Sequence, residues 1–102
     1  MTMNGKRFYV TATHATAAVA SKAAPSESGA RHYITGITVS SDKVGAIGLI
    51  KTGTTVIWQF QVGAGVHSIQ FTDPLVGDAI ALVSVEIDGA SACKANIMGF
   101  TL

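Results

Sequence analysis

The sequence predicts an all-β protein: an antiparallel β-sandwich or jelly roll of about seven to eight strands with an extended N-terminal arm. Three observations predict this class. Apolar and polar residues alternate along much of residues 31–102, Gly, Asp and Ser recur between the alternating runs, and no stretch there has a helical stripe. At 102 residues the chain fits one domain, residues 1–102, in which residues 1–10 form a flexible or interface-ordered arm.

The N-terminal part has the weakest pattern. Residues 1–7, MTMNGKR, lack periodicity and are typical of an arm. Residues 11–24, TATHATAAVASKAA, are rich in alanine, which permits a helix, but dense in threonine and valine, which favours an extended segment. We favour the strand and keep the helix as the alternative. The segment ends at Pro25 in the polar cluster PSESG.

Three strands are predicted between residues 31 and 62. In RHYITGITVS, residues 31–40, Tyr33 shares a face with Ile37 and Val39, and His32 lies on the opposite face. VGAIGLIK, residues 44–51, is apolar on both faces, as in a strand between layers, and a tight TG turn follows. The clearest alternation is TTVIWQFQV, residues 54–62, with four side chains facing inward: Val56, Trp58, Phe60 and Val62.

Three further strands complete the pattern. VHSIQF places His67, Ile69 and Phe71 on one side, and TDPLVGD after it is predicted as a loop because proline cannot donate to a β-ladder. AIALVSVEID, residues 79–88, puts four residues on one face: Ala81, Val83, Val85 and Ile87. The last strand is ACKANIMGFTL, which runs to residue 102.

Charge is scarce in this chain. Only 13% of residues are charged and 48% are hydrophobic, whereas an ordinary domain has about 25% charged residues. A small domain has much surface to cover, so we expect part of this surface to lie against protein neighbours. The candidate interface residues are those of the arm and of the entry to the strand at residue 31: Lys6, Arg7, Phe8, Tyr9, Arg31 and His32. Arg31 and His32 are expected to be solvent or interface groups.

The sequence pattern argues against two classes of partner, nucleic acid and membranes. Lysines and arginines are scattered at a net charge of +1, so no basic footprint for nucleic acid exists. No apolar run reaches the length of a transmembrane helix, and we expect no membrane partner.

No catalytic, cofactor-binding or metal-binding residues are predicted. There is no nucleophile elbow, and four acids fall in predicted turns: Asp42, Asp73, Asp78 and Asp88. The potential zinc ligands are far apart in sequence: His14, His32, His67 and Cys93. Two alternatives stay open, a histidine from each chain on a three-fold axis and a calcium site at Asp73 and Asp78. Cys93 is expected as a small buried residue, and as a lone cysteine it forms no intrachain disulfide. Trp58 and Tyr33 could stack on sugars, but their phase favours the core.

The order of these segments resembles a group of small tailed-phage virion proteins, several of them similar to jelly-roll capsid cement or decoration proteins. The resemblance covers residues from about 11 to 102. It rests on the packing motifs RHYITGI, TVIWQF and NIMGF. It implies a non-enzymatic structural protein without cofactors, made in the host cytoplasm and located on the capsid surface of the virion. It implies a homotrimer that binds the major capsid protein on the outside of a phage head and stabilises capsomer contacts. The alternatives are another virion component, such as a head fibre, tail hub or fibre tip, and a glycan-binding β-sandwich module.

Overall fold

The computed structural model describes residues 6–14, 17–41, 46–63, 65–88 and 93–102. These residues form eight strands and no helix, so no helix among them could cross a membrane. The strands are β1 (Lys6–His14), β2 (Ala17–Lys22), β3 (His32–Ser41), β4 (Ala46–Thr52), β5 (Thr55–Val62), β6 (Gly65–Val76), β7 (Val83–Asp88) and β8 (Cys93–Thr101).

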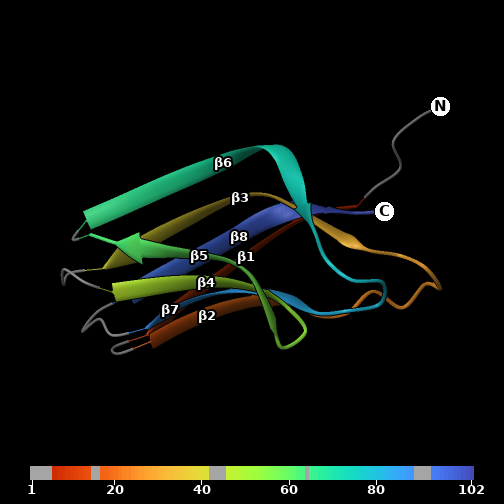
Figure 1. Ribbon diagram of the computed structural model, residues 1–102, viewed down its shortest axis with the longest axis horizontal. Helices are drawn as coiled ribbons and strands as arrows, with labels where there is room; N and C mark the ends of the chain where they lie inside the picture. Colours follow the sequence, from red (N-terminus) through yellow and green to blue (C-terminus); the bar gives the residue numbers. More distant parts are fainter. Residues whose placement is uncertain (1–5, 15–16, 42–45, 64, 89–92) are drawn as a thin grey trace.

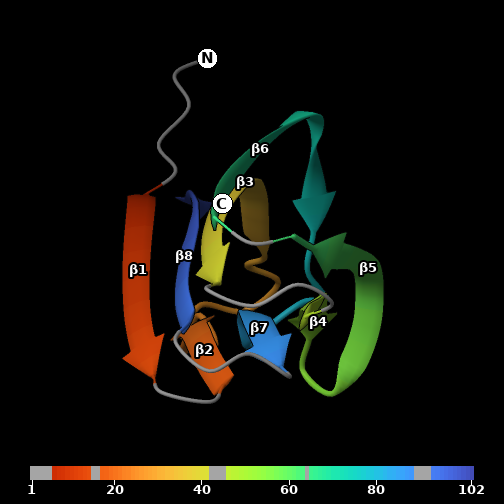
Figure 2. The same cartoon turned by 90° about the vertical axis from the view of Figure 1, so that its left-hand side faces the viewer.

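The strands build two four-stranded antiparallel sheets packed face to face (Figures 1 and 2). The first sheet has the order β1-β8-β3-β6, and the second has the order β2-β7-β4-β5. Successive strands largely alternate between the sheets, and the first and last strands pair, as in an eight-stranded jelly roll. The predicted fold class is confirmed.

The N-terminal segment differs from the prediction in one respect. Residues 6–10, assigned to an arm, form the start of β1, which pairs with β8 from Lys6 opposite Thr101 to His14 opposite Cys93. The arm assignment is wrong from Lys6 onward, because Phe8 and Val10 are apolar side chains that pack on the core. Residues 1–5 lie outside the described residues. The strand preference for residues 11–24 is confirmed by β1 and β2.

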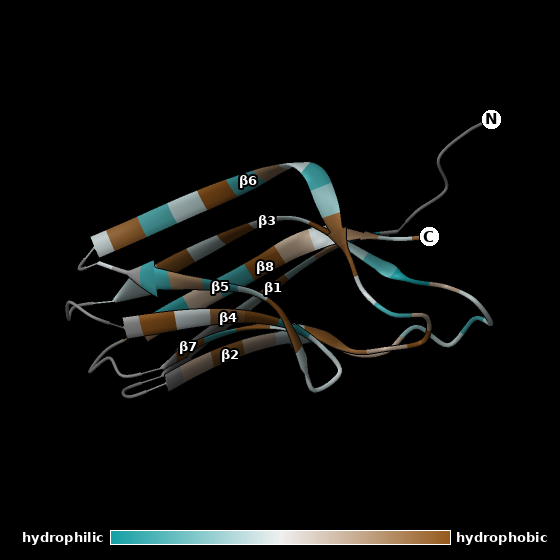
Figure 3. Ribbon diagram, in the orientation of Figure 1, coloured by the Kyte–Doolittle hydropathy of each residue, from teal (hydrophilic) through white to brown (hydrophobic). Residues whose placement is uncertain are grey.

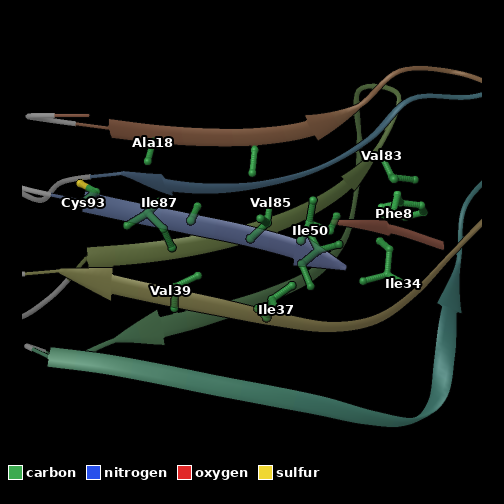
Figure 4. Packing of buried hydrophobic residues seen from close by; sticks show 13 residues of the cluster. Phe8, Ala18, Ile34, Ile37, Val39, Ile50, Val83, Val85, Ile87 and Cys93 are labelled. Carbon is green, nitrogen blue, oxygen red and sulfur yellow. The ribbon is translucent and has the colours of Figure 1, made fainter. Parts of the chain in front are cut away.

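The core lies between the sheets and is built from buried side chains of six strands, most of them valine or isoleucine (Figure 4). Val83, Val85 and Ile87 of β7 have no exposed surface, which confirms the predicted inner face of that strand. Cys93 is buried as expected. Each fully buried side chain of this size contributes about 1.5–3 kcal/mol of apolar burial. Along β6 hydrophobic and hydrophilic residues alternate (Figure 3), which places Ile69 and Phe71 against the core.

A bulge in β3 changes which side chains enter the core. The pairing with β6 and β8 shifts between Ile34 and Gly36, so the strict alternation predicted for residues 31–40 breaks at Thr35. His32 and Ile34 therefore share the inner face with Ile37 and Val39. The prediction of a solvent-facing His32 is wrong, as is the placement of Tyr33 on the face of Ile37 and Val39.

A register shift also changes which side chains of β5 face the core. The register of β5 with β4 shifts between Ile50 and Lys51, where Ile50 pairs with Trp58 and Lys51 with Val56. Trp58 and Phe60 pack on the core as predicted, but Val56 is 44% exposed and Ile57 packs inward instead. The side chain of Val62 lies outside the described residues.

The predicted loop at residues 72–78 is wrong over most of its length, because β6 continues to Val76. Ile34 pairs with Leu75 and Gly36 with Gln70, so residues 71–74 of β6 lie opposite Thr35 alone. The strand bends sharply there (Figure 1). Pro74 is tolerated because β6 is an edge strand and this segment needs no ladder donor from it.

Candidate functional site

The six candidate interface residues separate into exposed and buried groups. Arg7, Tyr9 and Arg31 are exposed, whereas Phe8 and His32 lie in the core. The side chain of Lys6 lies outside the described residues. Phe8 and His32 contact each other edge to face, with ring centroids 5.2 Å apart. An interface role for these residues stays a prediction.

The outer face of the β1-β8-β3-β6 sheet carries a band of apolar and aromatic side chains. Strand register places Arg7, Phe100, Tyr33 and Val76 in one cross-strand row. The adjacent row holds Tyr9 and Met98, followed by Gly36 and Gln70. We call the apolar members of these two rows the aromatic face: Tyr9, Tyr33, Val76, Met98 and Phe100.

Two rings of the aromatic face are stacked on each other. The rings of Tyr33 and Phe100 stack with centroids 5.0 Å apart and planes 5° from parallel. Tyr9 is 62% exposed and Val76 is 45% exposed, beside this pair in the sheet. Stacked rings on neighbouring strands give a rigid apolar surface with little side-chain entropy to lose on contact.

A buried polar atom lies in the next row of the same sheet. Asn96 pairs with Thr11 on one side and Thr38 on the other, and alternation along β8 directs it outward. Its Oδ1 is buried and has no hydrogen-bond partner among the described residues. An unsatisfied buried acceptor costs about 1–3 kcal/mol, a cost that a donor from a second protein surface would remove.

Few charged side chains lie around this face. Among the described outward side chains of β1, β3 and β8, Arg7 and Lys94 are cations, and the exposed Asp73 lies on β6, the strand that supplies Val76.

A pocket of about 490 Å³ opens at the end of the sandwich where β1 begins and β8 ends. The segment between β2 and β3 forms one wall. We call it the end pocket, and its lining residues are Arg7, Phe8, Lys22, Ala23, Ala24, Pro25, Ser26, Glu27, Ala30, His32, Thr101 and Leu102. The Lys22 ammonium lies 5.9 Å from the centre of the Phe8 ring.

His32 fixes the wall of the end pocket. Its Nε2 lies 2.7 Å from the Ala23 carbonyl oxygen and its Nδ1 lies 2.7 Å from Thr101 Oγ1. Since a carbonyl only accepts, Nε2–H donates to Ala23. The buried imidazole thus ties the β2–β3 segment to the last strand.

The metal-ligand candidates predicted from the sequence do not form a site among the described residues. In the part of the chain that the structure describes, no three His, Cys, Asp or Glu side chains gather as metal ligands would. Asp42 lies outside the described residues, as do the side chains of His14 and Asp88. The absence of metal and cofactor remains a prediction.

Sequence reasoning missed most of the aromatic face and of the end pocket. The signal for the first was present in β8, where Lys94, Asn96, Met98 and Phe100 alternate with small or apolar residues. For the end pocket, the signal was a pair of charged residues, Lys22 and Glu27, one before and one after Pro25. Neither signal states which other strands supply the neighbouring side chains.

The strand order defines the class of protein as a two-sheet jelly roll. No protein-family model and no curated protein matches the sequence. Several solved structures share the fold, and three of them are described below.

The C-terminal CBM6 of LamC, a marine laminarinase from Zobellia galactanivorans, superposes with a TM-score of 0.53 and 9% identity, over 90% of this chain and 98% of that one. The structure of PirA superposes with a TM-score of 0.51 and 15% identity, over 97% of this chain and 95% of that one. The insecticidal delta-endotoxin Cry8Ea1 from Bacillus thuringiensis gives 0.55 and 9% identity over 86% of this chain, which spans only 18% of the toxin. At these identities the similarity is one of fold.

Proposed function

We propose that this protein is a structural virion subunit, a capsid decoration or cement protein that assembles as a homotrimer on the outer surface of a phage head. The observation that carries the proposal is the aromatic face, an exposed apolar surface with a buried unsatisfied acceptor beside it. The jelly-roll fold, the scarcity of charge and the resemblance of RHYITGI, TVIWQF and NIMGF to phage virion proteins support the same role.

The aromatic face suits a trimer because a cyclic trimer uses heterologous contacts. Each subunit would place its aromatic face against a different surface of the next, and the ring closes after three. Apolar residues are also exposed on the second sheet, on the opposite side of the sandwich, where a contact with the capsid could cover them: Val19, Ile47 and Val56, exposed by 49%, 42% and 44%. Apolar burial supplies about 25 cal/mol per Å² of contact, part of which offsets lost rigid-body freedom.

Binding to a capsid would gain from the trimer. Three copies held together engage several lattice positions at once, so the avidity exceeds the affinity of one contact. The partner on the head would be the major capsid protein. Holding adjacent capsomers through one trimer stabilises their contacts without any chemical step.

The capsid role is tested by mixing the purified protein with phage heads that lack it and measuring co-sedimentation and the heat resistance of the heads. We expect saturable binding and heads that release DNA at a higher temperature. Absence of binding to the heads of the phage that encodes the protein contradicts the proposal. Binding confined to a tail or fibre would support another virion component instead.

A second candidate function is that of a glycan-binding module. The end pocket favours it, because a concave site with convergent polar groups is the usual form of a small-ligand site.

A further inference from the structure

We propose that the end pocket binds a short saccharide. This inference rests on the second candidate function and gives it a site, and it does not depend on the capsid role. The volume of about 490 Å³ lies within the range of small-ligand pockets.

The lining combines apolar walls with a few charged groups. Ala23, Ala24, Pro25 and Ala30 present apolar surface, and Phe8 contributes a ring. A sugar ring has apolar C–H faces and hydroxyls at its edges, so it can pack on such walls while its hydroxyls reach the polar groups. An entirely apolar ligand would instead remove water from the charged groups without replacing their hydrogen bonds.

The charged groups of the pocket form no ion pair among the described residues. The ion pair found within 4.0 Å in the described part of the chain is Lys51 with Glu86, which lies away from the pocket. Lys22, whose ammonium lies over the Phe8 ring, and Glu27 can therefore both bond to a ligand. Hydroxyls can accept from the ammonium and donate to the carboxylate, and each such charge-assisted bond is stronger than a neutral one.

The sign of these charges disfavours simple ions. A small inorganic anion would meet the carboxylate of Glu27, and a metal cation would meet the ammonium of Lys22. A polyhydroxylated ligand satisfies both signs at once. The class of ligand that fits the lining is therefore a saccharide rather than an ion.

The walls are held in place before a ligand arrives. His32 holds the Ala23 carbonyl, the Ala30 amide donates to the Glu27 carbonyl at 3.1 Å, and the Ile80 amide donates to the Ala30 carbonyl at 2.9 Å. A preformed site loses less conformational entropy on binding.

The test is saturation-transfer NMR with the full chain and a panel of methyl glycosides and disaccharides, neutral and carboxylated, followed by shift titration of any that respond. We expect at least one sugar to receive saturation and to shift residues of the end pocket. Glu27→Ala should weaken its binding about tenfold, because one charge-assisted bond is lost. Ala24→Trp, which fills an exposed wall position, should abolish it.

Two variants serve as controls. Lys94→Ala removes an exposed cation outside the lining, and Gln61→Trp adds an indole at an exposed position of β5. Both should bind like the unmodified chain, and amide spectra verify that all variants are folded.

The inference is overturned if no sugar of the panel receives saturation, if shifts map outside the pocket, or if Ala24→Trp binds unchanged. Response to inorganic phosphate alone would identify an anion site and also overturn it. Because this readout needs no assembly, loss of sugar binding and loss of capsid binding are separate results.

Discussion

Gly99 of β8 allows the backbone of β3 at Tyr33 and the ring of Phe8 in β1 to lie close to β8. It is buried in β8, and an added Cβ would overlap the Tyr33 carbonyl oxygen and lie 3.0 Å from Cζ of Phe8. A backbone oxygen cannot move aside without disturbing the β3–β8 pairing. We expect Gly99→Ala to lower the free energy of unfolding by about 2 kcal/mol or more.

Thermal unfolding by circular dichroism measures this effect, which corresponds to a fall in Tm of roughly 8 °C or more. Gly63→Ala is the matched control, because its added Cβ would meet only the His67 ring, at ordinary distances of 3.6 Å from Nε2 and 3.8 Å from Cε1. Equal Tm values for the two variants would contradict the close approach.

His32 should stabilise the fold through its two hydrogen bonds. His32→Phe keeps a ring in the core but leaves the Ala23 carbonyl and the Thr101 hydroxyl without that partner. We expect the free energy of unfolding, measured by urea denaturation, to fall by about 1–3 kcal/mol. His67→Phe is the control, since His67 is exposed and its bond to the Gly63 carbonyl, at 3.0 Å, is exposed too. A loss no larger than that of the control would show that His32 is not a structural tie.

At the level of elements, β1 belongs to the fold and is not a detachable arm. Deletion of residues 2–10 removes the half of β1 that pairs with residues 97–101 of β8 and takes Phe8 and Val10 from the core. We expect that variant to be unfolded or aggregated. Deletion of residues 2–5 stops short of the first paired residue and should leave the Tm nearly unchanged. A folded, stable product of the longer deletion, seen by circular dichroism and amide spectra, would contradict the role of β1.

The strands were predictable where alternation is regular, as in β7 and β8. The inner faces of the strands were not predictable where a bulge intervenes, because one extra residue moves every later side chain to the other face. The shift at Thr35 brought His32 into the core and turned Tyr33 outward. Residues 6–10 were misassigned because Phe8 and Val10 offer too short an alternation to be recognised before their pairing with β8 is known.

The candidate site was less predictable than the fold. Arg7 and Tyr9 were proposed as contact residues and are exposed, but Met98, Phe100 and Val76 join them through pairing between strands far apart in sequence. The end pocket likewise combines residues 7–8, 22–32 and 101–102. A single sequence shows alternation along each strand but not which strands become neighbours.

At the scale of the whole molecule, the aromatic face is expected to hold the subunits together. Tyr9→Ser removes the most exposed ring of this face without touching the core. Double substitution with Val76→Ser should shift the protein toward monomers, because two exposed apolar side chains no longer gain from burial. Sedimentation velocity measures the shift. The control on the same fold is Ser68→Ala, an exposed position of β6 outside the face, and an unchanged distribution for the double variant would place the contact elsewhere.

The most direct test of the account is the mass of the unmodified protein in solution, measured by size-exclusion chromatography with light scattering over a wide range of concentrations. Self-assembly predicts a species of three times the 10.5 kDa chain mass that persists on dilution. A single species of 10.5 kDa up to the highest concentration that stays in solution would contradict it.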